Sequence, residues 1–378
     1  MTERINVMKP WLGDEEAAAV AEVVRSGWVA QGPRVAAFEQ AFAASVEAPY
    51  AVAVSSCTTG LHLALVLAGI PAGSDVVVPS FSFIATTNAP TYVGANPVFA
   101  DVDELTGNLT ADTVEAALTP NTRAVIAVDQ GGVPIDLDAI RAVCDPRGIV
   151  VIEDAACGAG STYKGRPVGA GAALAAWSFH PRKLLTTGEG GMVTTGIEEW
   201  AARARRLREH GMSVSAAERH TNILPPAEEY LERAFNYRMT DLQAAIGLIQ
   251  LTRLPEMVAR RRELAAAYTK AFADVPGLRC CVADPSYGTS NFQSFWVQLG
   301  GDFPLDRDGL LAHLAAHDIS ARRGIMATHR QPAYAEHPRM PLPVTERLSD
   351  TTIILPLYHQ MTESEHSRVV EGVRTAGR

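Results

Sequence analysis

One lysine of the sequence stands where a reactive amine would be useful. Lys183 lies between a short apolar run and a glycine-rich turn, in Ser178-Phe-His-Pro-Arg-Lys183 followed by Thr186-Thr-Gly-Glu-Gly-Gly191. Hydroxyl-bearing residues, a histidine and glycines surround it, so we expect a pocket that depresses the pKa of the amine, as a Schiff-base lysine requires. Ser178 could add a hydroxyl to a phosphate site, and the glycines would let the backbone approach a flat ligand closely. The chain has only four lysines: Lys9, Lys164, Lys183 and Lys270.

A turn rich in small polar residues offers a second chemical feature. Ser55-Ser-Cys57-Thr58-Thr-Gly60 joins a strand-like run to a helix-like run. Free backbone N–H groups, hydroxyls and the positive end of a helix dipole together suit a phosphate. Ordinary capping of a helix by serine or threonine would explain the same pattern. The turn lacks a Walker lysine and a GxGxxG pattern, so the sequence does not favour a nucleoside triphosphate or a dinucleotide.

Two adjacent carboxylates end an apolar run, in Val150-Val-Ile-Glu153-Asp154. An acid at the end of a buried strand must be paired or hydrogen-bonded, because desolvation of a carboxylate is costly. Asp154 could cap the next helix, or it could be the counterion of a protonated ring nitrogen. A metal ligand is a third reading, but no histidine or cysteine stands at suitable spacing, and we predict no metal site.

Together, these three features are the parts that pyridoxal phosphate (PLP) needs. A lysine binds the cofactor covalently, and an acid keeps the pyridine nitrogen protonated so that the ring accepts electrons. A turn of small polar residues holds the phosphate. Phe83, which follows the apolar run at 76–79, would supply an aromatic ring to stack on the cofactor.

At this point the sequence resembles the DegT/DnrJ/StrS family of PLP-dependent sugar aminotransferases, which have the aspartate-aminotransferase-like fold. The resemblance runs nearly end to end, and the block from Lys183 to Gly191 is its most specific mark. The other marks are Ser26-Gly-Trp28-Val-Ala-Gln31-Gly-Pro33, Val78-Pro-Ser-Phe-Ser-Phe83, Tyr92-Val-Gly-Ala-Asn-Pro-Val-Phe, Glu153-Asp-Ala-Ala and Phe235-Asn236-Tyr-Arg238-Met-Thr-Asp-Leu-Gln-Ala-Ala.

The resemblance implies roles for individual residues. Lys183 and Asp154 match the catalytic Schiff-base lysine and the partner of the pyridine nitrogen. Asn236 matches an asparagine that reaches the phosphate from the neighbouring subunit, which implies a homodimer with shared active sites. Cys157 stands where the family often has a glutamine that contacts the ring hydroxyl of the cofactor. The remaining cofactor contacts that the resemblance implies are Cys57, Thr58, Phe83 and Ser178.

The resemblance also implies a reaction. An amino donor, glutamate or glutamine, would give its amino group to a keto sugar nucleotide, and the freed Lys183 would move the proton as a general acid–base. Two alternatives stay open: a ketocyclitol acceptor, as in aminoglycoside pathways, and a non-catalytic regulatory protein, which intact Lys183, Asp154 and Ser178 disfavour. The implied substrate contacts are Trp28, Gln31, His180, His210, Arg238, Arg322, Arg323 and His329.

Secondary-structure patterns indicate how these residues would be positioned. Short apolar runs separated by helical patterns predict a mostly parallel sheet with helices on both faces, and the resemblance gives it seven strands. Ligand sites in such sheets form beyond the carboxyl ends of the strands. The predicted strands are 51–54, 75–79, 97–100, 124–128, 149–154 and 292–299. The predicted helices begin at 14, 58, 136, 198, 241, 255, 308 and 363.

Length and composition bound the rest. With 378 residues, the chain can form a large PLP-binding α/β domain, 1–255, and a smaller C-terminal α/β domain, 256–378. A net charge of −9 without a basic block argues against nucleic acid as a partner. No window approaches the roughly 20 apolar residues that span a bilayer. The N-terminus lacks a signal-peptide pattern, and the five cysteines lack CxxC spacing, so we expect a cytoplasmic protein.

Overall fold

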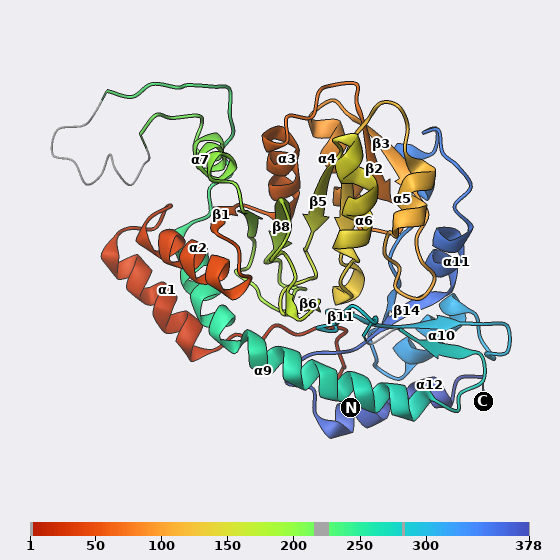
Figure 1. Cartoon of the computed structure of the whole chain (residues 1–378). Coiled ribbons are helices and arrows are strands. Elements are labelled where there is room, and N and C mark those ends of the chain that lie inside the picture. The colour runs from red at the N-terminus through yellow and green to blue at the C-terminus, as the bar shows by residue number, and fades with distance from the viewer. Residues whose placement is uncertain (1–2, 215–226, 282–283, 378) are drawn as a thin grey trace.

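The computed structural model describes residues 3–214, 227–281 and 284–377. Its largest sheet has seven strands in the order β1-β9-β8-β5-β4-β2-β3 (Figure 1). The five strands from β8 to β3 are parallel, whereas β9 runs antiparallel to both of its neighbours. This arrangement confirms the predicted mostly parallel sheet. Its strands are β1 (Tyr50–Val54), β2 (Asp75–Pro79), β3 (Asn96–Ala100), β4 (Thr122–Val128), β5 (Val150–Asp154), β8 (Leu174–Ser178) and β9 (Gly191–Thr195).

Both faces of this sheet are covered, which explains why its strands are apolar without alternation. One face packs on α3 (Cys57–Leu67), α4 (Ile84–Tyr92) and α7 (Glu198–Leu207) in a cluster that includes Val52 and Val54. The opposite face, with Ala51 and Ala53, packs on other helices in a second cluster. The helices of that second face are α2 (Pro33–Ser45), α5 (Ala111–Ala117), α6 (Leu137–Cys144) and α9 (Asp241–Phe272).

A four-stranded antiparallel sheet, in the order β10-β12-β14-β13, forms the core of the C-terminal part of the chain. The N-terminal segment joins it, because Ile5 forms a parallel bridge with Ile319. Its strands are β10 (Leu278–Cys280), β12 (Phe295–Leu299), β13 (Arg322–Arg323) and β14 (Thr352–Leu355). The neighbouring helices are α10 (Arg307–Ala316), α11 (Pro343–Thr351) and α12 (Glu363–Arg374), while α1 (Asp14–Ser26) packs on α9.

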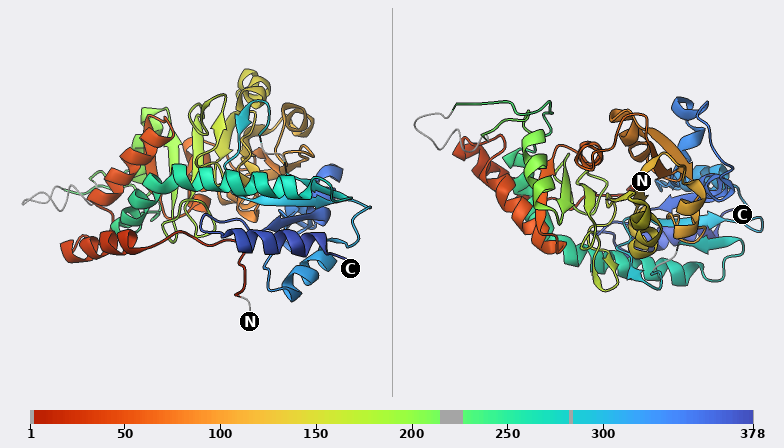
Figure 2. Two further views of the ribbon diagram at one scale, coloured as in Figure 1. Left: turned by 90° about the horizontal axis from the view of Figure 1, so that it is seen from below. Right: turned by 45° about the horizontal axis from the view of Figure 1, so that its top comes forward.

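Helix α9 links the two parts and corrects one prediction. The sequence predicts separate helices that meet at Pro255, but α9 continues through this residue to Phe272 (Figures 1 and 2). Proline removes one backbone hydrogen bond from a helix. Here residues on both sides of it, Leu254 and Met257, are buried, so packing along the helix outweighs the local preference. The division into domains at residue 255 stays a prediction.

The remaining elements are short. A three-stranded sheet, β11-β6-β7, consists of β6 (Thr162–Tyr163), β7 (Arg166–Pro167) and β11 (Gly288–Thr289). Single 3-10 turns are η1 (Gln130–Gly132), η2 (Asp145–Arg147), η3 (Thr328–Arg330) and η4 (Pro332–Tyr334). Among the described residues, we find no helix with both the length and the apolar character needed to cross a membrane.

Candidate active site

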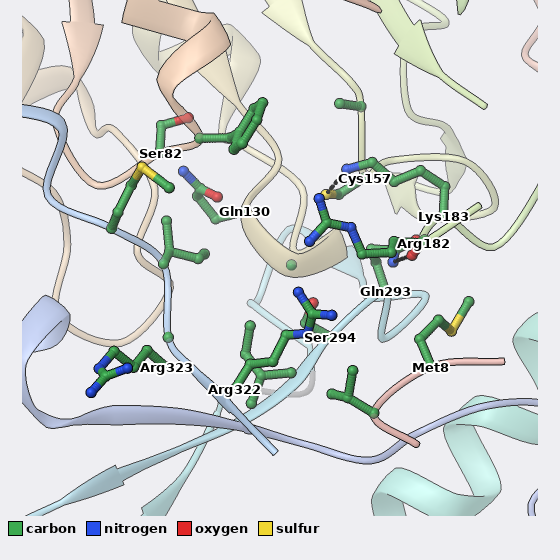
Figure 3. Close-up of a pocket in the computed structure, with 18 of the residues that line it drawn as sticks. Met8, Ser82, Gln130, Cys157, Arg182, Lys183, Gln293, Ser294, Arg322 and Arg323 are labelled. Atoms are coloured by element: carbon green, nitrogen blue, oxygen red, sulfur yellow. Dashed lines mark hydrogen bonds between the residues drawn. The ribbon is translucent and has the colours of Figure 1, made fainter. Parts of the chain in front are cut away.

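A cavity of about 1290 Å³ lies where the carboxyl ends of β4, β5 and β8 meet the beginning of α3. Val128, Asp154 and Ser178 line it from these strand ends. The C-terminal part of the chain closes the opposite side with β13 and the beginning of β12 (Figure 3). The cavity therefore occupies the position at which parallel sheets of this kind bind their ligands.

Lys183 enters the cavity from the loop between β8 and β9. Its Nζ atom lies 3.1 Å from Sγ of Cys157, at hydrogen-bond distance (Figure 3). Burial disfavours the ammonium form, but Cys157, Cys57 and Asp154 favour it and raise the pKa of Lys183 above its ordinary value. The side chains of the structure therefore do not depress the pKa of this amine, and that prediction was wrong. The sequence could not show it, because the two thiols and the carboxylate near the lysine come from distant segments of the chain.

The lysine loop passes very close to the beginning of α3. A Cβ atom at Gly191 would come within 2.5 Å of the backbone carbon of Ser56. A side chain is impossible at that distance, so the glycine is needed for contact between two backbones. The contact here is with another segment of the chain, and the approach of these glycines to a flat ligand stays a prediction.

Asp154 is the last residue of β5 and is only 3% exposed. Its Oδ2 atom accepts a hydrogen bond from Oγ1 of Thr86 at 2.8 Å, and Oδ1 accepts one from the backbone N–H of Ala156 at 3.2 Å. Burial raises the pKa of Asp154, whereas Thr86 and the lysine amine partly oppose that rise. A buried carboxylate that lines the cavity is well placed to hold a cation there.

The first turn of α3 has both of the properties that we inferred for it. Ser56 caps the helix, because its Oγ atom accepts a hydrogen bond from the backbone N–H of Thr59 at 3.2 Å. The hydroxyl of Thr59 bonds back to the Ser56 carbonyl at 2.8 Å. Cys57 and Thr58, in contrast, line the cavity, and as the first two residues of the helix their N–H groups have no intrahelical acceptor. Ser56 therefore caps the helix, while the N–H groups of Cys57 and Thr58 stay available to a ligand in the cavity.

Ser178 and Phe83 complete the cavity on two further sides. Ser178 ends β8 and is partly buried; its Oγ atom accepts a long hydrogen bond of 3.4 Å from the N–H of His180. Phe83 lines the cavity at the start of α4 with 58% of its surface exposed. An aromatic residue so exposed beside a cavity can stack on a flat ligand.

Comparison with known proteins identifies this arrangement. The model of the DegT/DnrJ/EryC1/StrS aminotransferase family matches residues 10–374. The chain belongs to this family. It is a PLP-dependent aminotransferase, as the sequence predicts, and the resemblance stated above is confirmed.

Solved structures of three aminotransferases match the whole chain. The aminotransferase TlmJ from Streptoalloteichus hindustanus is 38% identical, with 98% of each chain covered and a TM-score of 0.90. The putative sugar aminotransferase Spr1654 from Streptococcus pneumoniae, in its PMP form, is 26% identical, with 99% of this chain and 98% of that one covered and a TM-score of 0.92. DesI, in the presence of its TDP-sugar product, is 31% identical, with 100% and 94% covered and a TM-score of 0.90.

The residues of the cavity in this aminotransferase fit pyridoxal phosphate. They include a primary amine, Lys183, and a buried carboxylate, Asp154, whose hydrogen bonds leave it in contact with the same cavity. The N–H groups at the start of α3 and the hydroxyl of Ser178 are suitable donors for a phosphate. Phe83 offers an uncovered ring.

Several predicted contacts lie outside this cavity. Trp28, Gln31, Asn236 and Arg238 are not among the described residues that line it. Trp28 donates from Nε1 to the carbonyl of Gln31 at 3.1 Å, and Asn236 is exposed, with its backbone bridged to Glu209.

His329, also predicted as a substrate contact, is completely buried between the large sheet and the C-terminal part. Its Nδ1 atom lies 2.6 Å from Oγ of Ser80, and its Nε2 atom lies 3.1 Å from Glu346. Both ring nitrogens are therefore engaged, and the histidine holds a loop in place. His210, for its part, has a left-handed backbone at the end of the turn after α7 and does not line the cavity.

Three arginines near the cavity differ in their orientation and in their ion-pair partners. Arg182 and Arg322 line the cavity from opposite sides and extend into it (Figure 3). In the part of the chain that the structure describes, neither guanidinium has a hydrogen-bond or ion-pair partner. Arg323 also lines the cavity, but its side chain points away from Arg322, its neighbour in β13, and pairs with Asp308 at 3.0 Å (Figure 3). Adjacent residues of a strand face opposite sides, which explains the difference.

Sequence reasoning missed Arg182, Thr86, Asn291 and Gln293. Arg182 directly precedes Lys183, so its position was a usable signal. Thr86 hydrogen-bonds Asp154 from a separate helix, and Gln293 contacts the lysine loop from 109 residues away in sequence. No local pattern announces such contacts.

Proposed function

We propose that this aminotransferase moves an amino group from glutamate or glutamine to a keto sugar carried on a nucleotide. The observation that carries the proposal is the pair of guanidinium groups of Arg182 and Arg322, which extend into the cavity of Lys183 without an acidic partner among the described residues. A diphosphate supplies the negative charge that such cations bind. The relative DesI, whose structure was solved in the presence of its TDP-sugar product, supports the same class of substrate.

Within this reaction we assign the chemical steps to two residues. Pyridoxal phosphate, when bound, supplies a ring that takes up electrons from the reacting carbon. Lys183 would be the amine that links the cofactor to the protein, and its Nζ atom would then accept and return a proton as a general acid–base. Asp154 keeps a proton on the ring nitrogen through its buried carboxylate.

Other residues bind and orient. The backbone amides of Cys57 and Thr58 and the hydroxyls of Thr58 and Ser178, which line the cavity, would hold the phosphate, and Phe83 would stack on the cofactor ring. Cys157 lies beside Lys183, and its thiol would take the place of the glutamine amide that the family often has near the ring hydroxyl of the cofactor. His180, which also lines the cavity, contacts the substrate at the rim.

We further propose a homodimer in which Asn236 serves the site of the other subunit. Its exposed position outside the cavity of its own chain supports this role, since a residue that completes a neighbouring site must face outward. Trp28, Gln31 and Arg238, which also lie outside the cavity, would approach the substrate in the same way.

A substrate panel tests the proposed function. Purified enzyme would be supplied with glutamate or glutamine and with either keto sugar nucleotides or uncharged ketocyclitols, and formation of the keto acid from the donor would be followed. We expect the highest kcat/KM for a keto sugar nucleotide. Faster turnover of a ketocyclitol would contradict the proposal, and absence of any turnover together with absence of bound cofactor would favour a regulatory protein.

Arginine variants refine this test. Loss of a charge-assisted hydrogen bond costs about 1.5–3 kcal/mol, so Arg322→Ala and Arg182→Ala should raise KM for the nucleotide substrate roughly 10- to 150-fold. The matched control is Arg323→Ala, because Arg323 is the next residue of the same strand and pairs with Asp308. An equal effect of all three substitutions would show that no specific anion contact exists.

A further inference from the structure

A short loop of the C-terminal part, residues 291–293, contacts both segments that carry a pair of polar groups at hydrogen-bond distance in the cavity. These groups are Nζ of Lys183 and Sγ of Cys157, 3.1 Å apart. They come from different loops, one after β8 and the other after β5. A contact between two loops depends on whatever holds each loop in place.

Gln293 holds the lysine loop on both sides of Lys183. Its Oε1 atom accepts a hydrogen bond from the backbone N–H of Leu184 at 2.9 Å, and its Nε2 atom donates to the carbonyl of Arg182 at 2.6 Å. One buried amide therefore binds the peptide groups immediately before and after the lysine. This arrangement fixes the direction in which the lysine side chain leaves the backbone.

Asn291 holds the other loop. Its Nδ2 atom donates to the carbonyls of Cys157 at 2.7 Å and Ala159 at 2.8 Å. Its Oδ1 atom accepts a hydrogen bond from the backbone N–H of Gln293 at 2.7 Å. Asn291 therefore also fixes the backbone from which the Gln293 side chain extends. Asn291 is completely buried, and both the nitrogen and the oxygen of its amide form hydrogen bonds.

Arg261 anchors this loop to the rest of the C-terminal part. Its guanidinium donates to the carbonyls of Phe292, Gln293 and Leu357, each at 2.8 Å. Phe292 has a left-handed backbone with φ of 50°, a conformation that costs energy for a bulky residue and persists only where its surroundings enforce it. The bonds from Arg261 to the carbonyls of Phe292 and Gln293 contribute to that constraint.

We propose that Gln293 and Asn291 are positioning residues that set the contact between Lys183 and Cys157, and thereby the electrostatic surroundings of the amine that carries the cofactor. The proposal rests on the proposed role of Lys183. The titratable and charged groups that face this amine are Cys157 and Asp154 from the end of β5, Cys57 from α3, and His180 and Arg182 from its own loop. If the lysine moves away from Cys157, the distances between its amine and these groups change, and so do the electrostatic interactions that favour its protonated form.

Two substitutions test this role. Gln293→Met keeps the length of the side chain but removes both hydrogen bonds, whereas Gln293→Glu keeps an acceptor for Leu184 and regains the donor for Arg182 only when it is protonated. The matched control is Gln250→Leu. Gln250 is equally buried and donates to the carbonyl of Trp11 at 2.6 Å, but it lies away from the cavity.

The decisive readout is the pH at which the visible absorbance of the bound cofactor changes halfway. We expect Gln293→Met to lower this midpoint by about half to one pH unit, because the lysine nitrogen moves away from Cys157, which lies 3.1 Å from it when Gln293 holds the loop. Gln250→Leu should leave the midpoint unchanged. In addition, kcat of Gln293→Met should fall while KM changes little, because Gln293 contacts the backbone of the lysine loop.

Recovery of the activity of Gln293→Glu at low pH is a further test, because a purely structural role of Gln293 does not predict it. The kcat of Gln293→Glu relative to the wild-type enzyme should rise as the pH falls, since a protonated glutamate restores the second hydrogen bond; the same ratio for Gln293→Met should stay constant. An unchanged midpoint in both variants, with cofactor attached to Lys183 as in the wild type, would overturn the proposal. Attachment to another lysine would overturn the proposed function instead. If Gln293→Met does not fold, the absorbance midpoint and acid rescue of Gln293→Glu decide.

Discussion

Replacement of Glu153 by glutamine should stabilise the enzyme at pH 8 but not at pH 4.5. Glu153 precedes Asp154 in β5, is 2% exposed, and its Oε2 atom has no hydrogen-bond partner within the described residues. Burial raises the pKa of this carboxyl from its ordinary value of 4.5 to about 7. Burial and the charge of Glu153 also raise the pKa of Asp129, so the two buried acids disfavour each other's ionisation.

The magnitude follows from the pKa difference. The folded protein keeps the proton of Glu153 up to about pH 7, whereas the unfolded chain releases it near 4.5. The free energy of unfolding therefore decreases as the pH rises from about 4.5 to about 7, and the loss is complete above that range. At 1.36 kcal/mol per unit, a difference of about 2.5 units corresponds to about 3 kcal/mol, which Glu153→Gln should recover at pH 8.

Urea titrations of the wild type and the variant at a series of pH values, with equal protein and cofactor concentrations, measure this difference. Glu16→Gln is the control, because Glu16 is also buried but pairs with Arg253 at 2.7 Å; its loss should destabilise the protein at pH 8. A Glu153→Gln variant that is no more stable than the wild type at pH 8 would refute the reasoning.

The remaining predictions concern the site itself. Asp154→Asn should retain bound cofactor but lose transamination by roughly three or more orders of magnitude, because the ring nitrogen loses its anionic partner; near-normal turnover would make Asp154 a structural cap. Asn236→Ala should weaken cofactor retention roughly 10- to 150-fold, as measured by dialysis and absorbance. Mixed Lys183→Ala and Asn236→Ala subunits should regain part of the activity if Asn236 acts across the dimer, since one site of each heterodimer then carries neither substitution. Heterodimers without recovery would place Asn236 in the site of its own chain.

Much of the fold could be predicted from the sequence because the strands from β1 to β5 are mostly apolar runs; β8 and β9, which flank the lysine loop, were not predicted as strands. The run at 75–79 matches β2 at both ends, and Asp154, the last residue of β5, lies where ligands bind in parallel sheets. The motif around Lys183 was informative because its residues are contiguous. These features depend on local pattern, which a single sequence shows.

Other features depend on contacts between distant segments. The buried contacts of His329 with Ser80 and Glu346 join residues that are far apart in the chain, so the sequence could not distinguish a structural histidine from a ligand. The raised pKa of Lys183 has the same origin, since its thiol neighbours belong to α3 and to the loop after β5. The prediction of a helix boundary at Pro255 was wrong because the sequence does not show that the residues on both sides of it are buried.

The most direct test of the account is to find which lysine carries the cofactor. Borohydride reduction of the yellow purified enzyme, followed by peptide mass spectrometry, fixes the cofactor to the amine that holds it. We predict a single phosphopyridoxyl group on Lys183, the lysine of the cavity. A group on Lys9, Lys164 or Lys270 instead would contradict the account.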